Sequence, residues 1–251
     1  MSLLNRVAIV TGAGRGIGRA ISLELAGRGA AVAALDVDES GAAETCRLAS
    51  AAGGEASPFA CDITDRDQVE RTVTEVLSAF GHIDILVNNA GAVQRVAFTE
   101  ESPEAVERDI AVNLTGHLWV TQAVAKHMAS QGAGKIVNIA SEAAVLGAQK
   151  AAVYAAAKGG LVSLTRSLAK ELAPHKVNVN CVCPGPTDSP MYREAMDRDP
   201  AWAQAFIDHI PMKRMAKPEE VAATVAFLCS EAAGYVTGLV LGVDGGLTRS
   251  P

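Results

Sequence analysis

A glycine-rich turn near the N-terminus constrains the fold of this chain more than any other feature. It lies in the run R-V-A-I-V-T-G-A-G-R-G-I-G-R-A, which begins at Arg6. Residues 6–11 are apolar and mostly β-branched, as expected for a short buried strand, and residues 17–28 carry a helical pattern. A second strand is predicted over 31–35, and Asp36 follows it directly. Strand, turn, helix and strand-end acid together predict a βαβ unit of the dinucleotide-binding type.

The glycines of this turn give the prediction its physical basis. Without side chains they let backbone N–H groups approach a pyrophosphate, and the helix that follows supplies partial positive charge at its N-terminus. The glycines are Gly12, Gly14, Gly16 and Gly18. A purely structural turn is the alternative interpretation, but the preceding strand and Asp36 favour a nucleotide site.

A second informative feature is the sequence Y-A-A-A-K, which spaces Tyr154 and Lys158 four residues apart, downstream of Ser141. On a helix, residues with this spacing share a face. We expect the cationic Lys158 to lower the pKa of the Tyr154 phenol, so that it exchanges a proton nearer neutral pH. That chemistry makes or breaks an alcohol O–H while hydride moves at its carbon. The spacing is weak alone and becomes informative beside a nucleotide-binding unit.

Strand and helix patterns alternate along the whole chain, which is typical of a parallel sheet covered by helices. The sequence therefore predicts an α/β fold: a single dinucleotide-binding and catalytic domain over 1–251, doubly wound, with seven parallel strands and helices on both faces. The predicted strands are 6–11, 31–35, 56–60, 83–88, 135–139, 177–182 and 236–242. The predicted helices are 17–28, 39–52, 66–80, 103–128, 152–173, two near 190–208, and 218–230.

The composition excludes several other classes of protein. Of 251 residues, 49% are apolar and 20% charged, which is enough for a sizeable core. The net charge of −6 argues against binding to nucleic acid or to an anionic membrane. We find neither a signal segment nor the roughly 18-residue apolar run of a membrane helix. The five cysteines are odd in number and lack C-x-x-C spacing, so a reduced cytoplasmic protein is expected, and the scattered histidines predict no metal site.

Over essentially its whole length, the chain resembles the short-chain dehydrogenase/reductase family. The resemblance rests on T-G-A-G-R-G-I-G at 11–18, Asp36, C-D-I at 61–63, N-N-A-G at 88–91, Asn113 in V-N-L-T-G, Ser141 before Y-A-A-A-K, and P-G at 184–185. These motifs occur in the order that the family shows. The resemblance implies a Rossmann-type enzyme that interconverts a secondary alcohol and a ketone with a nicotinamide cofactor.

The resemblance also implies roles for individual residues. Tyr154 would be the general acid/base, Lys158 would assist it and bind the nicotinamide ribose, Ser141 would stabilise the substrate oxygen, and Asn113 would hold a water in a proton relay. The implied cofactor contacts are Gly12, Arg15, Gly16, Ile17, Gly18, Asp36, Asp62, Ile63, Asn89, Ala90, Gly91, Tyr154, Lys158, Pro184, Gly185, Thr187 and Ser189. The family usually has Thr where Ser189 stands, and Thr187 also carries a hydroxyl, so the carboxamide contact stays open between the two.

Asp36 governs the expected choice of cofactor. A carboxylate at the end of the second strand accepts hydrogen bonds from a ribose diol and repels a 2′-phosphate. Arg15 acts in the opposite direction, but Val37 offers no second cation. We therefore expect NAD rather than NADP.

The substrate is less constrained by the sequence. In motif detail the chain is most similar to members of the 2-hydroxycyclohexanecarboxyl-CoA dehydrogenase type and the 3-oxoacyl-carrier-protein reductase type. By resemblance, residues 186–217 form a substrate lid, with Met191 and Trp202 as candidate contacts. Glu142 is unexpected beside Ser141, where small or apolar residues are usual: it would repel anionic substrates, orient a hydroxyl, or simply face solvent. Arg95 and Gln149 are further candidate substrate contacts.

Three functions are compatible with these observations. The first is an NAD-dependent oxidoreductase acting on a hydroxyacyl thioester or a cyclic alcohol. The second is a 3-oxoacyl-carrier-protein reductase that uses NADPH, which Asp36 disfavours. The third is a non-catalytic NAD-binding scaffold, disfavoured because Ser141, Tyr154 and Lys158 are all present. A homotetramer is also implied, with the small-residue face of helix 152–173 at a subunit interface.

Overall fold

Seven parallel strands form one central sheet, in the order β3-β2-β1-β4-β5-β6-β7. The computed structural model describes residues 2–198 and 200–249. The strands are β1 Val7–Thr11, β2 Ala31–Asp36, β3 Glu55–Ala60, β4 Ile85–Asn88, β5 Gly134–Ile139, β6 Val177–Pro184 and β7 Val240–Val243. The chain runs outward from β1 to β3, then returns to the other side of β1 and runs from β4 to β7. The predicted Rossmann-type α/β fold is confirmed.

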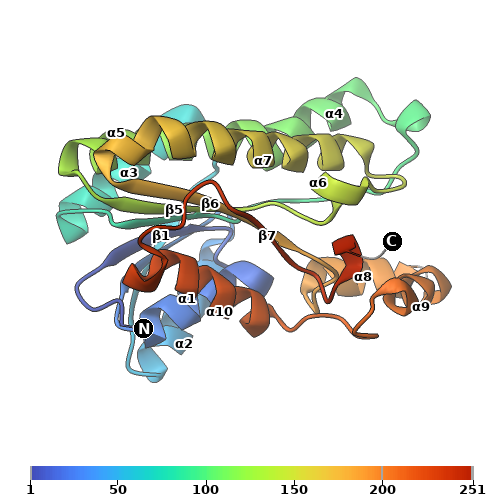
Figure 1. Ribbon diagram of the computed structural model, residues 1–251, viewed down its shortest axis with the longest axis horizontal. Coiled ribbons are helices and arrows are strands. Elements are labelled where there is room, and N and C mark those ends of the chain that lie inside the picture. Colours follow the sequence, from blue (N-terminus) through green and yellow to red (C-terminus); the bar gives the residue numbers. More distant parts are fainter. Residues whose placement is uncertain (1, 199, 250–251) are drawn as a thin grey trace.

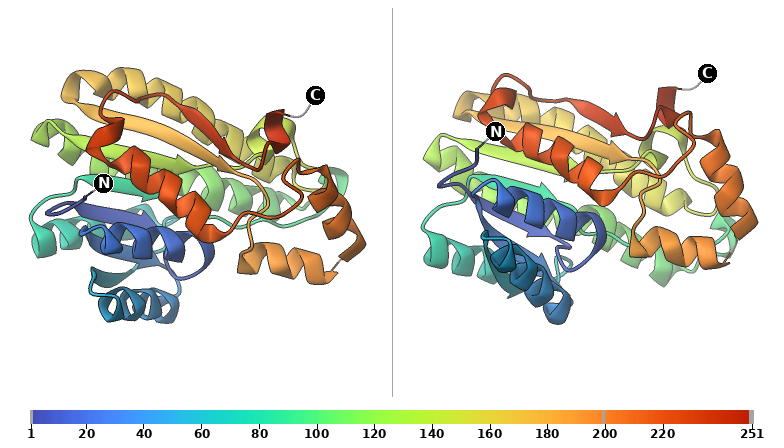
Figure 2. Two further views of the ribbon diagram at one scale, coloured as in Figure 1. Left: turned by 60° about the horizontal axis from the view of Figure 1, so that its bottom comes forward. Right: turned by 90° about the horizontal axis from the view of Figure 1, so that it is seen from below.

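Helices cover both faces of this sheet (Figure 1). On one face lie α1 Gly16–Gly27, α2 Glu39–Ala51 and α10 Pro218–Cys229; on the other lie α3 Arg66–Phe80, α4 Pro103–Ile110, α5 Gly116–Gln131 and α7 Ala152–Leu172. Short helices α6 Ala143–Leu146, α8 Pro190–Arg198 and α9 Pro200–His209 lie beyond the carboxyl ends of the strands (Figures 1 and 2). Single 3₁₀ turns occur at Phe98–Glu100, Ala173–His175, Glu231–Ala233 and Leu247–Arg249.

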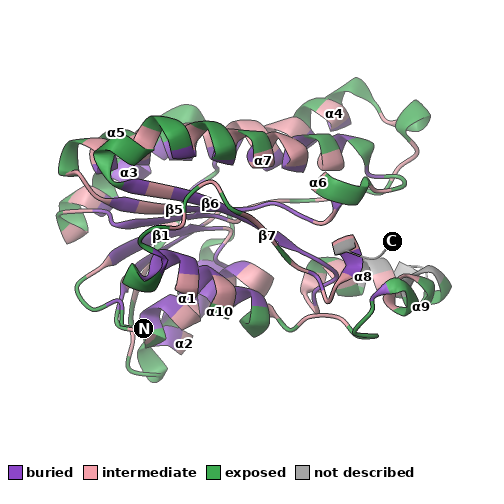
Figure 3. Ribbon diagram, viewed as in Figure 1, coloured by how far each residue is buried: buried purple, intermediate pink, exposed green. Residues whose placement is uncertain are grey.

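The core consists of two apolar layers, one on each face of the sheet (Figure 3). Successive side chains of a strand point to opposite faces, so Ala8 and Val10 pack under α1 and α10 while Val7 and Ile9 pack under α3 and α5. The strands are buried on both sides, which is why they read as continuous apolar runs in the sequence.

The order in which the strands are added to the sheet reverses between β1 and β4: β2 and β3 lie on one side of β1, and β4 to β7 lie on the other. This reversal positions the site. β1 pairs with β2 on one side and β4 on the other, with Ile9 opposite Ala33 and Leu86 respectively. The connections leaving β1 and β4 diverge there, which opens a crevice at the carboxyl edge of the sheet. Ligands of doubly wound sheets bind at this kind of position.

Two predicted elements differ from the structure. The predicted helix 103–128 is interrupted by a π-helical turn at Ala111–Thr115, which local periodicity does not reveal. The last predicted strand, 236–242, is observed only from Val240 to Val243, because Gly238 adopts a φ of +75° and bends the chain before the strand. The short helix α6 was not predicted.

Two features bear on the expected environment of the protein. All five cysteines are buried and carry free thiols. Among the residues that the structure describes, no helix has both the length and the apolar character needed to cross a membrane.

Candidate active site

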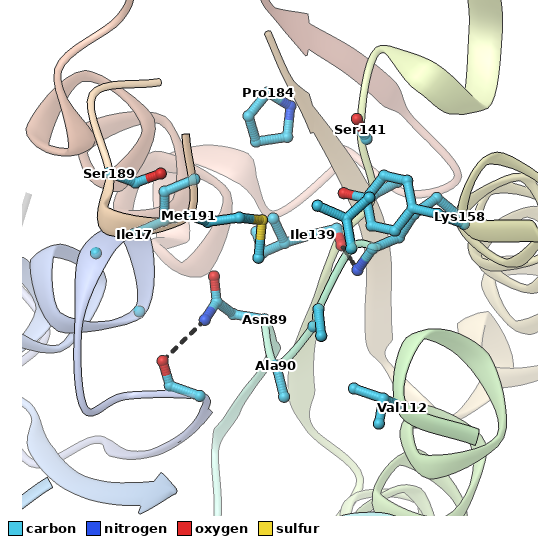
Figure 4. A pocket seen from close by; sticks show the side chains of 18 of the residues that line it. Ile17, Asn89, Ala90, Val112, Ile139, Ser141, Lys158, Pro184, Ser189 and Met191 are labelled. Atoms are coloured by element: carbon cyan, nitrogen blue, oxygen red, sulfur yellow. Dashed lines mark hydrogen bonds between the residues drawn. The ribbon is translucent and has the colours of Figure 1, made fainter. Parts of the chain in front are cut away.

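A cavity of about 770 Å³ lies at the carboxyl edge of the sheet, over the β1–β4 reversal. Every residue predicted to contact the cofactor lines it, together with Ser141, Glu142, Arg95 and Met191. In Figure 4, Ser189 and Met191 approach from one side and Ser141 and Lys158 line the opposite wall, with Asn89 and Ala90 between them. Residues distant in sequence meet here because the carboxyl ends of parallel strands share one edge of a sheet.

The glycine-rich turn has the shape that a pyrophosphate requires. Gly12 has a φ of +65°, and a Cβ there would lie 2.7 Å from the Cα of Ala90, so a side chain would collide with the next loop. The Asn89 side chain donates hydrogen bonds to the carbonyl oxygens of Thr11 (2.9 Å) and Gly12 (3.1 Å), which fixes the turn. Helix α1 then begins without a side-chain cap and without an acid in its first turn. Its N-terminal N–H groups therefore suit an anion at the cavity.

Asp36 is held rigidly at the end of β2. Its carboxylate accepts hydrogen bonds from the backbone N–H groups of Gly14 (2.7 Å) and Asp38 (2.9 Å). Arg15, the N-cap of α1, is exposed on the cavity rim. The pKa of Asp38 is lowered by hydrogen bonds from Ser40 and Gly41 and, to a lesser extent, by the charge of Arg15. Asp36 and Arg15, the acid and the base that bear on the choice of cofactor, thus lie at the same end of the cavity.

Lys158 is buried at the other end, with 3% of its surface exposed. Its ammonium donates a hydrogen bond of 3.0 Å to the carbonyl oxygen of Ile139, at the end of β5 (Figure 4). Nζ lies 5.8 Å from the centroid of the Tyr154 ring, one turn earlier on α7. Burial lowers the pKa of Lys158 to about 8, because an enclosed ammonium loses its hydration.

The pKa of Tyr154 is raised in this structure, whereas the spacing of Tyr154 and Lys158 predicted a lowered one. Burial is the largest influence and raises the pKa of Tyr154 to about 12, and the carboxylate of Glu142 adds to the increase. A hydrogen bond with Ser141 and the charge of Arg95 act in the opposite direction. Enclosure of a phenol disfavours the phenolate, and the ammonium is directed at a backbone carbonyl rather than at the phenol oxygen.

Asn113 lies behind the cavity wall rather than in it. It is fully buried within the π-helical turn, and its amide donates to the carbonyl oxygens of Ala92 (2.8 Å) and Asp109 (3.0 Å). A Cβ on Gly91 would lie 3.0 Å from Asn113 Oδ1 and 3.3 Å from Lys158 Nζ, so the two side chains converge on that glycine. The π turn widens the helix locally, a distortion found frequently at functional sites.

Glu142 follows Ser141 directly and is half-buried in the cavity wall. The Ser141 hydroxyl donates a hydrogen bond of 2.7 Å to its carboxylate, and Ser141 Oγ accepts one of 3.1 Å from the backbone N–H of Ala143. Burial is the main influence on the Glu142 carboxyl and raises its pKa; hydrogen bonds and the charge of Arg95 lower it to a smaller extent. Glu142 therefore lies in the cavity wall, with part of its surface still exposed.

Of the remaining candidate substrate contacts, some line the cavity and others do not. Met191 and Arg95 line the cavity, whereas Gln149 is exposed and does not. The side chain of Trp202 lies outside the described part of the structure. Tyr192, one residue after Met191, also lines the cavity. It belongs to the bulky residues of the predicted lid, 186–217, but was not among the individual candidate contacts.

Thr187 and Ser189 both line the cavity, and their hydroxyls differ in their partners. Thr187 is buried and its hydroxyl donates to the carbonyl oxygen of Gly185 at 2.9 Å. Ser189 Oγ accepts a longer hydrogen bond, 3.4 Å, from the backbone N–H of Tyr192. The geometry leaves both hydroxyl oxygens available as acceptors toward a carboxamide.

A doubly wound parallel sheet with this glycine turn and a Ser–Tyr–Lys cluster at its reversal point defines a nicotinamide-dependent oxidoreductase. A family model described as enoyl-(acyl carrier protein) reductase matches residues 12–248. The chain belongs to the short-chain dehydrogenase/reductase family, whose members act on CH–OH groups with NAD(P).

Curated relatives match over nearly their whole length. The chain is 38% identical to a 3-oxoacyl-[acyl-carrier-protein] reductase of Thermotoga maritima, covering 98% of this chain and 99% of the relative. It is 41% identical to a cis-4-hydroxycyclohexanecarboxylate dehydrogenase of Sinomonas cyclohexanicum (97% and 96%) and 39% identical to a (3R)-3-hydroxyacyl-CoA dehydrogenase of Mus musculus (98% and 98%). These relatives interconvert secondary alcohols and ketones.

Solved structures agree closely in fold. Levodione reductase superposes with a TM-score of 0.95 at 35% identity, covering 99% of both chains. A dehydrogenase from Agrobacterium tumefaciens with bound NADP gives 0.92 at 37% identity (99% and 98%). NAD⁺-bound xylitol dehydrogenase gives 0.94 at 33% identity (98% and 100%). The fold therefore accommodates either cofactor.

Proposed function

We propose that this protein is an NAD-dependent oxidoreductase that interconverts a secondary alcohol and its ketone on a medium-sized apolar substrate, either a hydroxyacyl thioester or a cyclic alcohol. The observation that carries the proposal is the single cavity in which Ser141, Tyr154 and Lys158 face the glycine turn and Asp36. A non-catalytic scaffold would have no need to keep a proton donor and a cation beside each other in the nucleotide site.

The residues present fit a nicotinamide dinucleotide. The turn from Gly12 to Gly18 and the open N-terminus of α1 would hold the pyrophosphate, Asp36 the adenosine ribose, and Asp62 with Ile63 the adenine. Asn89 to Gly91 would brace the cofactor, Lys158 would bind the second ribose, and Thr187 or Ser189 would bind the carboxamide. When bound, the nicotinamide ring accepts hydride from the alcohol carbon or returns it to the ketone.

In the proposed reaction, the proton of the substrate hydroxyl is transferred to and from Tyr154. In oxidation Tyr154 takes the proton of the substrate hydroxyl, and in reduction it gives the proton back. Ser141 donates a hydrogen bond to the substrate oxygen and stabilises the charge that develops there. Lys158, with Asn113 behind it, supplies positive charge next to the phenol and a path for the proton.

NAD is favoured over NADP by the position of Asp36. Its carboxylate is fixed by two backbone N–H groups, so it cannot swing away from a 2′-phosphate without losing both hydrogen bonds. Arg15 is the feature that favours the second candidate, a 3-oxoacyl-carrier-protein reductase using NADPH, and a relative of that name is among the matches. Repulsion between a fixed carboxylate and a phosphate outweighs the attraction of one exposed guanidinium.

The segment from 186 to 217 is proposed as the lid over the substrate. It contributes Met191 and Tyr192 to the cavity, and the neighbouring helix α6 adds Ala143. This surface suits an apolar body with few polar anchors. Small polyols would bury too little surface to be good substrates.

A coupled absorbance assay at the wavelength of reduced nicotinamide tests the proposal. Purified protein would be supplied with NADH or NADPH and either acetoacetyl-CoA or cyclohexanone, and with NAD⁺ and the matching alcohols. We expect NADH-dependent reduction of at least one ketone and the reverse reaction with its alcohol. Absence of turnover with all of these pairs, in protein that still binds NADH, would contradict the proposed activity.

A further inference from the structure

The proton of the Ser141 hydroxyl is already committed to Glu142. Ser141 donates to Glu142 Oε2 at 2.7 Å, and its oxygen accepts from the N–H of Ala143 at 3.1 Å. A serine hydroxyl has one proton and two acceptor lone pairs. While the carboxylate holds that proton, Ser141 can accept a further hydrogen bond but has none to donate to a substrate oxygen.

We propose that Glu142 is a positioning residue whose protonation turns the Ser141 hydroxyl toward the substrate. The inference rests on the proposed function and deepens it. With a proton on Glu142, the hydrogen bond between the two side chains reverses: the carboxylic acid donates to Ser141 Oγ. Both lone pairs of the serine oxygen are then occupied, by Ala143 N–H and by Glu142, and the serine proton is directed into the cavity. The acceptors in reach of it there are the substrate oxygen and the hydroxyl of Tyr154, which is also within hydrogen-bond reach of Ser141.

The proton balance of this switch is simple. One proton binds to Glu142 from solvent, to which the half-buried side chain is partly exposed. No bond of the substrate forms or breaks, and the proton delivered in reduction still comes from Tyr154. Glu142 therefore sets the orientation of a donor and is not consumed in the reaction.

The surroundings of Glu142 favour the neutral form. Tyr154 on α7, Cys183 on β6, Tyr192 on α8 and Arg95 in the loop after β4 interact electrostatically with it. Arg95 is the one cation in that set and stabilises the carboxylate, but burial outweighs it and raises the pKa of Glu142. The ionised carboxylate also raises the pKa of Tyr154. Ionisation of Glu142 thus withdraws the Ser141 donor and makes phenolate formation at Tyr154 harder.

The raised pKa of Glu142 sets the direction in which ketone reduction should depend on pH. Glu142 has a raised pKa in the folded protein, so its neutral form predominates below that value and is lost as pH rises through it. Above the midpoint, the protonated fraction falls about tenfold for each pH unit. Ketone reduction that depends on the Ser141 donor should fall with the same slope.

Glu142→Gln separates this role from a structural one. The glutamine amide can donate to Ser141 Oγ at every pH, as the protonated acid does. Reduction of acetoacetyl-CoA or cyclohexanone by NADH would be measured across pH for the native protein, Glu142→Gln and Glu219→Gln. Glu219 is an exposed acid at the start of α10, so its variant makes the same charge change far from the cavity.

We expect Glu142→Gln to lose the alkaline decline that the native protein and Glu219→Gln share. The glutamine variant should gain about tenfold relative to native for each pH unit above the Glu142 midpoint. Identical pH profiles in native and Glu142→Gln would overturn the proposal. If the native protein reduces neither ketone, the proposed function is at fault, and the coupling of Ser141 to Glu142 is decided by the next measurement.

Infrared titration of the cofactor-free protein tests that coupling without turnover. The carboxylic-acid band present in native protein and absent from Glu142→Gln reports the protonation of Glu142 directly. Ser141→Ala removes the donor that stabilises the carboxylate, so the Glu142 midpoint should move to higher pH. An unchanged midpoint in Ser141→Ala would show that the two side chains do not share a proton-dependent hydrogen bond, and would overturn the inference.

Discussion

The Lys158 ammonium donates a hydrogen bond to the carbonyl oxygen of Ile139 at 3.0 Å, which ties helix α7 to the carboxyl end of β5. This contact holds a buried cation one helical turn from Tyr154. Burial of this ammonium costs free energy of folding, because an enclosed lysine loses the hydration of its charged form. The stability of the protein should therefore depend on the protonation of Lys158.

Lys158→Met should reveal that dependence in unfolding measurements. Burial lowers the pKa of Lys158 from 10.5 to about 8 in the folded state. Between those values the unfolded chain binds more protons, so native stability rises with pH in that window. Relative to Lys158→Met, the native protein should gain up to about 3 kcal/mol from pH 8 to 10.5. Denaturant titrations of both proteins at several pH values would measure the difference. A constant difference would contradict the lowered pKa.

Tyr154→Phe should reduce turnover by roughly 10²-fold or more, the usual scale for loss of a general acid or base. The fold and NADH binding should be retained, since the ring still fills its place. Steady-state kinetics and a fluorescence titration with NADH would check both points. Tyr192→Phe is the matched comparison, because it removes a second phenol from the same cavity. A larger loss in Tyr192→Phe would transfer the proton-donor role to that residue.

Asp36→Ala should narrow the preference for NAD(H) over NADP(H) by about tenfold or more, a change of at least ~1.4 kcal/mol. The substitution removes the carboxylate that repels a 2′-phosphate and leaves Arg15 to attract it. The measurement is kcat/KM for each cofactor. Asp38→Ala is the control, because Asp38 caps α2 nearby and does not line the cavity. Equal kcat/KM values for both cofactors in native protein would refute the assignment.

Glu142 should disfavour a free carboxylate near the reacting carbon at pH values where it is ionised. Native protein is therefore expected to prefer a β-hydroxyacyl thioester over the corresponding hydroxy acid. Glu142→Gln should lessen that preference, because the amide carries no charge. The ratio of kcat/KM for the two substrates measures the effect. A native preference for the free acid, or an unchanged ratio in the variant, would be inconsistent with the repulsion.

A homotetramer is expected, with the small-residue face of α7 and the half-exposed edge strand β7 between subunits. A Cβ at Gly159 would meet no atom within 4 Å, so we expect Gly159→Arg to leave the subunit folded and to disrupt association. Light scattering at micromolar concentration would show whether the mass falls. Ser50→Arg, at an exposed position on α2, is the control. A native monomer at that concentration would refute the assembly.

The sequence alone determined the order of the strands and the residues expected to contact the cofactor, all of which line the cavity. Apolar β-branched runs can be buried on both faces of a sheet, so the strands around Ile9, Ala33 and Leu86 were recognisable. Motifs at strand ends were expected to meet, because parallel strands place their carboxyl ends on one edge. Residues of sequence motifs that follow β1, β2, β3, β4 and β5 do line one cavity.

Tertiary structure alone decided the electrostatics and the hydrogen bonding inside that cavity. The spacing of Tyr154 and Lys158 predicted a lowered phenol pKa, but enclosure raises it to about 12, and burial is a property of the packed molecule. Likewise, adjacency in the chain does not reveal that the Glu142 carboxylate lines the cavity and accepts a hydrogen bond from the Ser141 hydroxyl. Local pattern specifies which residues reach a site, whereas pKa values and proton positions depend on the desolvation and partners that the whole fold imposes.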